Sequence, residues 1–291
     1  MKSILSPRQF AQGIGVSESS VKRWIDDGQI SASRTAGGHR RIPIQEAARY
    51  IRDHGVVVVR PDVIGLAEVG GARREPTEAA GERLLGYLRS GSASEARGLL
   101  LSRYLEGSSV AEIVDGPLEY AMARIGEAWV ENDSGIFWEH RATQIAIEAL
   151  ARLRLALPSG SGGVAAVGGA PSGDPYLLPS VAVAAVMEAE GLQATNLGPE
   201  TPLSSLALAA ADLDARIVWL SVSVVADCAK LRRGIEKLAS ESADRGAVLA
   251  VGGSQAAGLR LTKVPGLFVG RSMAELEALV QGMRFASTTR A

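Results

Sequence analysis

Residues 164–288 alternate short runs rich in Val, Ala and Gly with longer stretches of helical periodicity. Five short runs are candidate strands: 164–169, 194–197, 217–223, 248–253 and 267–269. The longer stretches are candidate helices: 177–190, 203–213, 230–243, 255–261 and 273–283. Strands and helices alternating at this spacing predict a parallel sheet with helices on both faces. We therefore expect a flavodoxin-like, doubly wound α/β domain over 164–288.

The loops after these strands form the expected binding region of the domain. Doubly wound sheets bind ligands beyond the carboxyl ends of their strands, at the point where the strand order reverses. The loops concerned are 168–179, 198–202, 221–227 and 252–255.

Composition divides the rest of the chain into further segments, and the whole predicts a multidomain protein. Residues 1–60 are basic, and residues 61–76 contain the Pro and Gly of a linker. Residues 77–158 have few β-branched runs and predict a bundle of about four helices. A Ser- and Gly-rich stretch, 158–163, separates this bundle from the sheet.

The charge of the chain is unevenly distributed. Residues 1–60 contain ten Lys and Arg against five Asp and Glu, a net +5. Because the whole chain carries −1, the other 231 residues carry −6. A basic N-terminal segment on an acidic body is typical of a nucleic-acid-binding module joined to another domain.

The start of this segment predicts two short helices joined by a turn. Ser6-Pro7 begins one helix and Ser17 begins the next, as capping hydroxyls do. The second helix has an apolar stripe that we expect to face the core: Val21, Trp24 and Ile25. Its opposite face offers side chains for DNA: Ser19, Lys22 and Arg23. Two such helices form the usual reader of the DNA major groove.

A β-hairpin is expected after the second helix. Residues 30–35 and 39–44 flank Gly37-Gly38, which is typical of a tight hairpin turn. Four basic side chains near its tip are placed for phosphate contacts: Arg34, His39, Arg40 and Arg41. The pair Arg40-Arg41 by itself is equally consistent with a solvated surface, but the helix-turn-helix before it favours DNA.

Residues 1–55 resemble MerR-type and excisionase-like winged-helix domains. The resemblance rests on three runs: Gly15-Val16-Ser17, Val21-Lys22-Arg23-Trp24, and Arg34 through Ile42. It implies double-stranded DNA at an operator or promoter as partner, bound by dimers or higher homo-oligomers on repeated half-sites.

The helical segment contains Trp129, then nine residues, then Glu139-His140 at the expected start of a long helix. Taken alone, a Trp belongs more often to a core, and a Glu-His pair to a surface. The spacing, however, resembles the helical cap over adenosylcobalamin in light-responsive MerR-type regulators of the CarH/LitR kind. That resemblance implies that Trp129, Glu139 and His140 contact the ligand from above the corrin.

The loops of the predicted sheet are similar to those of cobalamin-binding domains. Residues 196–202 resemble the second loop, and Ser221-Val222-Ser223 and Gly252-Gly253 resemble the serine and double-glycine motifs. The resemblance implies that Ser221, Ser223, Gly252 and Gly253 line the slot for the nucleotide tail. Without the resemblance, a bare glycine pair such as Gly252-Gly253 more often simply ends a strand.

The first loop departs from this family. Its acidic-x-His-x-x-Gly motif falls on residues 174–179, where Asp174 is kept, Tyr176 replaces the histidine and Pro179 replaces the glycine. In the family that histidine is the lower cobalt ligand. A phenol, whose usual pKa is about 10, is a far poorer metal ligand at neutral pH. His140 is then the imidazole left to coordinate any metal, from the upper side.

Other features exclude several classes of protein. The single cysteine, Cys228, allows neither an internal disulfide nor a thiolate metal cluster. No apolar segment reaches membrane-spanning length, and the first residues lack a secretory h-region, so we expect a cytoplasmic protein without a membrane partner. Phosphate-loop and nucleophile-elbow motifs are absent from the sequence, and we expect no enzyme activity.

Two hypotheses remain for the C-terminal half of a DNA-binding transcription regulator. In one, it is a sensor that binds a corrinoid or another planar ligand, with adenosylcobalamin the cofactor that the fold suggests. In the other, it serves only oligomerisation or protein interaction. A third, a cobalamin-dependent enzyme or methyl carrier, is disfavoured by the DNA-binding segment.

Overall fold

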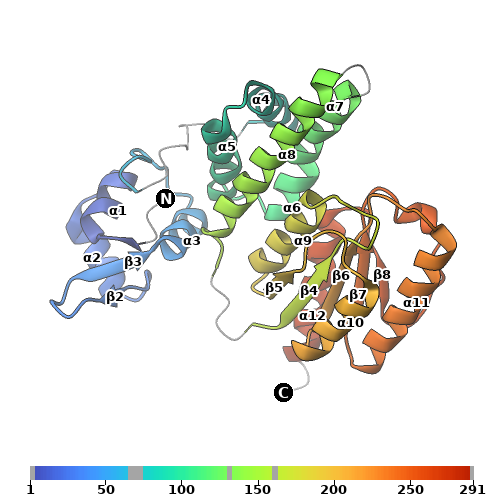
Figure 1. The fold of residues 1–291 in the computed structure, drawn as a ribbon. Helices are drawn as coiled ribbons and strands as arrows, with labels where there is room; N and C mark the ends of the chain where they lie inside the picture. The colour runs from blue at the N-terminus through green and yellow to red at the C-terminus, as the bar shows by residue number, and fades with distance from the viewer. Residues whose placement is uncertain (1–3, 65–74, 130–132, 159–162, 289–291) are drawn as a thin grey trace. The chain divides into compact units, whose positions relative to one another are not determined.

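The computed structural model describes residues 4–64, 75–129, 133–158 and 163–288. The chain forms two compact units, Met1–Ser159 and Gly160–Ala291, and each is described by itself. The boundary falls within the Ser- and Gly-rich stretch. Figure 1 gives the labels of the helices and strands.

The N-terminal unit begins with a small winged helix-turn-helix, here called the head (residues 4–64). Its elements are β1 (Ile4–Leu5), α1 (Pro7–Ile14), α2 (Glu18–Asp26), β2 (Ser33–Arg34), β3 (Arg40–Pro43) and α3 (Ile44–His54). The strands form an antiparallel sheet in the order β1-β3-β2. The predicted helix-turn-helix and hairpin are therefore present, and β1 and α3 add to them.

Hydroxyl caps begin both helices of the motif, as the sequence predicts. The Ser6 hydroxyl accepts the N–H of Gln9, and the Gln9 side chain accepts the N–H of Ser6, which completes a capping box. The Ser17 hydroxyl accepts the N–H of Ser20 at 3.1 Å. Between the helices Gly15 adopts a left-handed φ of 72°, a conformation that glycine reaches without strain.

The head has its own apolar core and extends beyond residue 60. The fully buried side chains include Leu5, Phe10, Val21, Ile42, Ile51 and Ile64. Ile64, which the sequence analysis assigns to the linker, lies so close to Gly13 that a Cβ on that glycine would be 2.4 Å from it. The head thus includes residues through Ile64, because burying this apolar side chain fixes the segment before it.

Helices make up the rest of the N-terminal unit. They are α4 (Thr77–Ser90), α5 (Ala93–Leu105), α6 (Val110–Ile113), α7 (Glu119–Trp129) and α8 (Asp133–Arg154). A π-helical turn, Val114–Leu118, joins α6 to α7 and contains Pro117. Proline lacks the N–H of a regular α-helical bond, which accounts for the wider turn. Helix α5 packs on α8, and α4 packs on α7.

One arginine of the head is bound to the helical segment. The guanidinium of Arg52 in α3 donates to the backbone oxygens of Tyr104 and Ser108, the latter at 2.8 Å. It also lies over the Tyr104 ring, 4.0 Å from the ring centre. Cations at the carboxyl end of a helix interact favourably with its last carbonyls, so Arg52 ties α3 to the end of α5.

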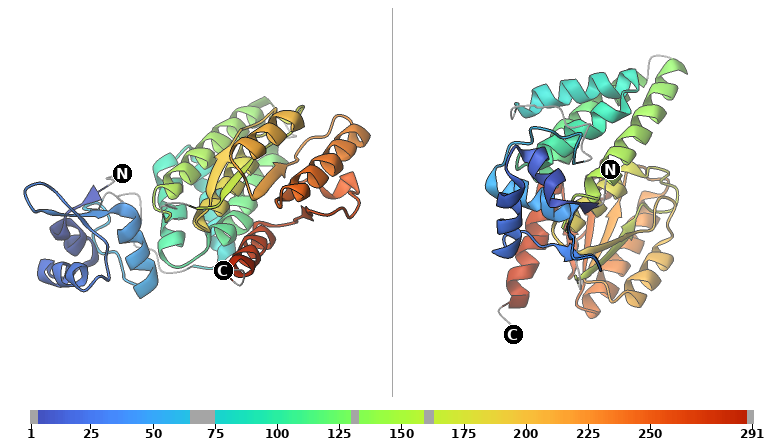
Figure 2. Two further views of the ribbon diagram at one scale, coloured as in Figure 1. Left: turned by 90° about the horizontal axis from the view of Figure 1, so that it is seen from below. Right: turned by 90° about the vertical axis from the view of Figure 1, so that its left-hand side faces the viewer.

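The C-terminal unit is a five-stranded parallel sheet between helices (Figures 1 and 2). The strands are β4 (Ala165–Gly169), β5 (Gln193–Asn196), β6 (Ile217–Ser221), β7 (Val248–Gly252) and β8 (Leu267–Val269). Their order is β5-β4-β6-β7-β8, with all neighbours parallel. This is the order of flavodoxin-like sheets, in which the winding reverses between the first and third strands.

The helices of this unit cover both faces of the sheet, which confirms the predicted layering. They are α9 (Leu178–Ala189), α10 (Leu203–Asp212), α11 (Cys228–Asp244) and α12 (Met273–Thr288). Helices α10 and α11 contact one another and the sheet, and α9 contacts β4, β5, β6 and α12. The core combines Val and Leu of the strands with apolar side chains of α10 and α11.

Two predicted helices differ from the observed ones. The helix expected over 255–261 is a single 3₁₀ turn, Ala257–Leu259, because Arg260 adopts a left-handed φ of 49° that ends it. The helix expected to begin at His140 begins at Asp133 instead, so Glu139 and His140 lie in its second turn. Among the described residues, no helix is both long and apolar enough to span a membrane.

Candidate functional site

Helix α2 presents a polar face on the side away from the core. Val21 is buried, whereas the three predicted DNA-contacting side chains Ser19, Lys22 and Arg23 are exposed. Lys22 Nζ lies 2.8 Å from Glu18 Oε1, and this hydrogen bond holds the pKa of Glu18 below its usual value. An exposed pair of this kind contributes little to stability, so Lys22 is able to exchange Glu18 for a DNA phosphate.

The prediction that Trp24 belongs to the core holds only in part. Trp24 and Ile25 are half-buried, and only Val21 of the expected stripe is fully buried. The Trp24 ring stacks on Tyr50 of α3, with 4.9 Å between the ring centres. Helix α3, which the sequence analysis does not predict, therefore supplies an aromatic partner on which Trp24 lies at the rim of the core.

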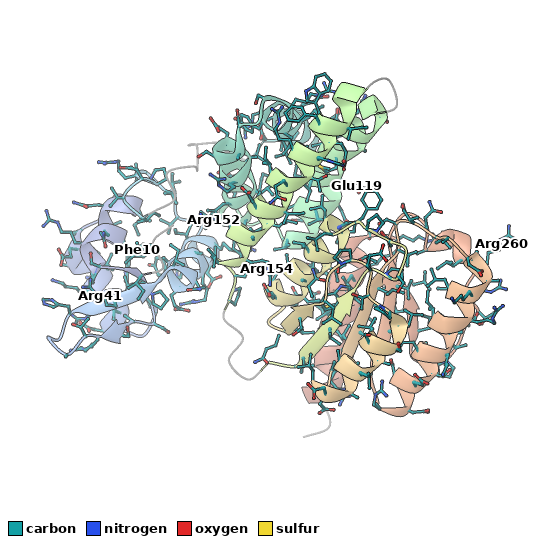
Figure 3. All side chains as sticks on the ribbon, in the orientation of Figure 1. Phe10, Arg41, Glu119, Arg152, Arg154 and Arg260 are labelled. Atoms are coloured by element: carbon teal, nitrogen blue, oxygen red, sulfur yellow. The ribbon has the colours of Figure 1, made fainter. Side chains whose placement is uncertain are left out.

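The hairpin of β2 and β3 carries the other four predicted DNA-contacting residues. Its turn is closed by two backbone hydrogen bonds, from Thr35 to His39 and from Gly38 to Thr35. Arg34 and His39 are exposed, and Figure 3 shows Arg41 on β3. The turn thus places basic side chains at the tip of a hairpin that lies next to α2, to which Arg40 is paired through Asp26.

Arg40 and Arg41 point to opposite sides of β3. Side chains alternate along a strand, and Arg40 shares its face with the buried Ile42. On that face Arg40 Nη2 lies 2.6 Å from Asp26 Oδ1, at the end of α2. Arg40 therefore fixes the hairpin to α2, while Arg41 lies on the other face. The sequence treats the two arginines as equivalent, and the structure separates them.

The residues predicted to form a roof over a ligand lie at the end of α7 and in α8. The side chain of Trp129 lies outside the described residues. Glu139 accepts a hydrogen bond from Thr143 at 2.9 Å, and His140 is exposed with Nε2 3.6 Å from Glu139 Oε2. Ile136, Phe137 and Trp138 are also exposed large apolar side chains.

Asp174 ties together the loops at the carboxyl edge of the sheet. Its side chain is fully buried, and Oδ2 accepts the N–H groups of Ser223 at 2.5 Å and Val224 at 3.1 Å. Oδ1 accepts the N–H of Tyr176 at 3.1 Å. A buried carboxylate is stable when such donors surround it. Asp174, predicted to face a ligand, instead joins the loop after β4 to the loop after β6.

Of the glycine pair at the end of β7, Gly253 also has a role in the backbone. Gly253 has a φ of 101°, and a Cβ there would lie 2.4 Å from the carbonyl oxygen of Val222. A Cβ on Gly252 would meet nothing closer than the Gly270 oxygen at 3.6 Å. Only Gly253 is therefore required by the fold, since it lets this loop approach the end of β6.

The remaining predicted ligand residues differ in their accessibility. Ser221 is buried at the end of β6, and Ser223 is half-buried with its N–H bound to Asp174. Tyr176 is exposed. Within the described ranges, no three His, Cys, Asp or Glu side chains gather in a way that could hold a metal ion.

Trp219 of β6 is a residue that the sequence analysis does not identify. It is 1 % exposed, and its ring lies against Gly168 on β4, where a Cβ would be 2.2 Å from the indole. Its Nε1 donates to the Ser180 hydroxyl at 3.0 Å, and Ser180 donates to Asn196 at 2.8 Å. The sequence does show a bulky residue, Trp219, in one predicted strand and a glycine, Gly168, in another. That the two residues lie opposite each other follows only from the strand register in the structure.

The residues that the resemblance assigns to a corrinoid do not fit that group in this unit. Asp174 and the N–H of Ser223 hold two loops together, Gly253 allows a third loop to approach them, and Tyr176 takes the place of the histidine in the sequence motif. The loop after β4 is also bonded to the loop after β5, from Thr201 to Ala170 and from Ala170 to Gly198. The loops at this edge of the sheet are thus joined to one another by hydrogen bonds.

Comparison with known proteins finds a domain family at the N-terminal end of the chain and a shared fold with solved structures. The model of the helix-turn-helix domain family matches residues 4–55. These residues are an N-terminal helix-turn-helix DNA-binding domain. A comparison with curated protein sequences finds no significant match.

Solved structures are similar to a large part of the chain. The monomethylamine corrinoid protein of Methanosarcina barkeri has a TM-score of 0.52 at 15 % identity, covering 70 % of this chain and 98 % of that one. A cobalamin-binding protein from Desulfitobacterium hafniense DCB-2 gives 0.37 at 17 % identity, over 72 % and 98 %. The methanol:cobalamin methyltransferase complex of M. barkeri gives 0.34 at 14 % identity, over 72 % and 80 %. The first of these likenesses shows a shared fold.

Proposed function

We propose that this chain is a DNA-binding transcription regulator of the MerR type, acting as a homo-oligomer. The observation that carries the proposal is the exposed basic face of α2, with Lys22 and Arg23 opposite the buried Val21. Beside it stands a hairpin with exposed Arg34 and His39. Helix α2 would enter the major groove, and the hairpin would contact phosphates.

Charge supports the same proposal. The net +5 of residues 1–60 favours a polyanion, and the acidic remainder disfavours binding elsewhere on the chain. A single head reads a short site, so the proposal includes two or more copies on repeated half-sites about one helical turn apart. It places the protein with the DNA in the cytoplasm and assigns it no enzyme activity.

The experiment is DNA binding by the full chain, using a duplex selected from a random pool and fluorescence anisotropy. Lys22→Ala/Arg23→Ala should weaken binding at least about tenfold, as the loss of two contacts to phosphate or base does. Lys237→Ala is the matched control, because Lys237 is also an exposed lysine paired with a glutamate four residues away. Equal binding by the double variant and the control would contradict the proposal.

A second candidate is a regulator that responds to a corrinoid, with adenosylcobalamin and light as the effectors that the resemblance implies. It is supported by the shared fold with the monomethylamine corrinoid protein. The hydrogen bonds that join the loops at the edge of the sheet support the other form, in which the C-terminal unit serves oligomerisation or protein interaction without a cofactor or another planar ligand.

These two forms differ in a simple measurement. The full chain is mixed with hydroxocobalamin or adenosylcobalamin, passed through a gel-filtration column, and its absorbance is recorded. Corrinoid absorbance in the protein peak would favour the corrinoid-responsive form. Its absence, together with unchanged DNA binding in light and dark, would favour the cofactor-independent form.

A further inference from the structure

We infer that Trp219 and Asp174 fill and close the crevice of the C-terminal sheet, so that this unit excludes an inserted ligand group such as the nucleotide tail of a cobalamin. The inference concerns the C-terminal unit alone and does not depend on DNA binding. It rests on where the crevice of such a sheet lies and on what occupies it here.

The crevice is expected between the ends of β4 and β6. These neighbouring strands lead away in opposite directions, β4 through α9 to β5 and β6 through α11 to β7. In sheets of this order the loops after two such strands diverge and leave an opening for a ligand. Here those loops contain Asp174 on one side and Ser223 and Val224 on the other.

Asp174 spans this opening. Its Oδ2 receives two N–H groups from the β6 loop while its own backbone belongs to the β4 loop, and the side chain is 0 % exposed. A group entering between the loops would have to break both hydrogen bonds and leave a buried carboxylate without its donors. Such bonds to a charged acceptor are among the stronger ones in proteins.

Trp219 fills the space next to the opening, between the sheet and α9. The indole is seated on Gly168, directly across from it in the β4–β6 register. Its N–H is bound to Ser180 of α9, and Ser180 is bound to Asn196 at the end of β5. Trp219 is the largest fully buried side chain of the described residues. It therefore fills the layer between the sheet and α9, and its contacts connect β4, β5, β6 and α9.

This arrangement changes what restoring the histidine should do. If Tyr176 alone prevented corrinoid binding, Tyr176→His would restore it. With Trp219 and Asp174 in place, the inserted group still has no room, so Tyr176→His should bind hydroxocobalamin no better than the natural chain.

The test uses the full chain with hydroxocobalamin and with cobinamide, which lacks the nucleotide tail. The natural chain and Tyr176→His should retain at most a trace of hydroxocobalamin after gel filtration, and Tyr176→His/Trp219→Ala should retain at least about tenfold more than that trace. Tyr176→His/Trp219→Phe is the matched control, because it keeps a ring over Gly168 and should behave like Tyr176→His. Retention of cobinamide but not hydroxocobalamin by the natural chain would also support the inference.

Stoichiometric retention of hydroxocobalamin by the natural chain or by Tyr176→His would overturn the inference. If Tyr176→His/Trp219→Ala folds but binds hydroxocobalamin no better than Tyr176→His, Trp219 is not what excludes the ligand. Because that variant could fail to fold, hydrogen exchange of the natural chain provides a second test. The amides of Ser223 and Val224 should be protected, and their protection should not change when hydroxocobalamin is added; loss of protection would contradict the closure. Failure of DNA binding would count against the proposed function alone.

Discussion

In the head, the polar residues of the motif lie outside a scaffold that other residues build. Lys22 and Arg23 are exposed because Val21 and the capped helix ends fix the direction of α2. In the C-terminal sheet, the polar residues of the motif are themselves the scaffold, and Asp174 is fully buried while holding two loops. The same kind of sequence resemblance thus corresponds to exposed side chains in one region and to buried side chains that hold loops together in the other.

This difference has a physical origin in what the backbone needs at each place. A helix satisfies its own N–H groups beyond the first turn, which leaves its exposed side chains free for a partner. The loops at the edge of a sheet have N–H groups without strand partners, and a carboxylate can accept hydrogen bonds from them. A glycine in such a loop allows another backbone segment to approach closely. Motif residues in loops are therefore more readily used by the fold itself.

The largest effect that would break this comparison concerns Asp174. Asp174→Ala should destabilise the C-terminal unit by about 3–5 kcal/mol, because three backbone N–H groups lose the buried carboxylate that accepts their hydrogen bonds. Chemical denaturation followed by circular dichroism measures this, with the exposed Asp212→Ala as control. A loss of unfolding free energy no larger than that of the control would contradict the structural role of Asp174 and favour a role in ligand binding.

A smaller effect separates the two glycines at the end of β7. Gly253→Ala should cost about 2–4 kcal/mol, since its φ of 101° and its contact with Val222 leave no room for a Cβ. Gly252→Ala, the matched control, should cost less than about 1 kcal/mol. Thermal unfolding of both variants decides it. An equally small loss of stability for both variants would contradict the backbone requirement for glycine at position 253.

Trp24 tests the other side of the comparison. Trp24→Ala should destabilise the head by about 1–3 kcal/mol, less than a fully buried Trp would, because its ring is half-buried on Tyr50. The measurement is the unfolding of the full chain followed by near-ultraviolet circular dichroism. A head that no longer folds would show that Trp24 belongs to the core after all.

The smallest effect distinguishes the two arginines of β3. Arg41→Ala should lower the salt slope of DNA binding by about one unit, as the loss of one phosphate contact does. Arg40→Ala should lower it less, because Arg40 already pairs with Asp26. The measurement is the affinity at several salt concentrations, and a larger change for Arg40 would reverse these roles.

The sequence predicts the fold more completely than the site, and particular residues show why. The alternation of strands and helices over 164–288 predicts the parallel sheet, because the periodicity of apolar residues identifies each strand and helix locally. Ser6 and Ser17 predict both helix starts because capping is local. In contrast, the closeness of Trp219 to Gly168 depends on the register of two strands some fifty residues apart, which no local pattern contains.

The same limit applies to the direction in which motif residues point. The opposite orientations of Arg40 and Arg41 follow from strand alternation only when it is known that Ile42 faces the core. The burial of Ile64 on Gly13 likewise depends on how the chain returns to α1, which composition does not contain.

The most direct test of the account is the salt dependence of DNA binding by the full chain and by Lys22→Ala/Arg23→Ala. We predict that the logarithm of the affinity of the natural chain falls linearly with the logarithm of the salt concentration. The double variant should lose about 0.9 units of slope for each of its residues that contacts a phosphate. Affinity that does not respond to salt, or an equal slope and affinity for both proteins, would contradict the claim that α2 binds DNA.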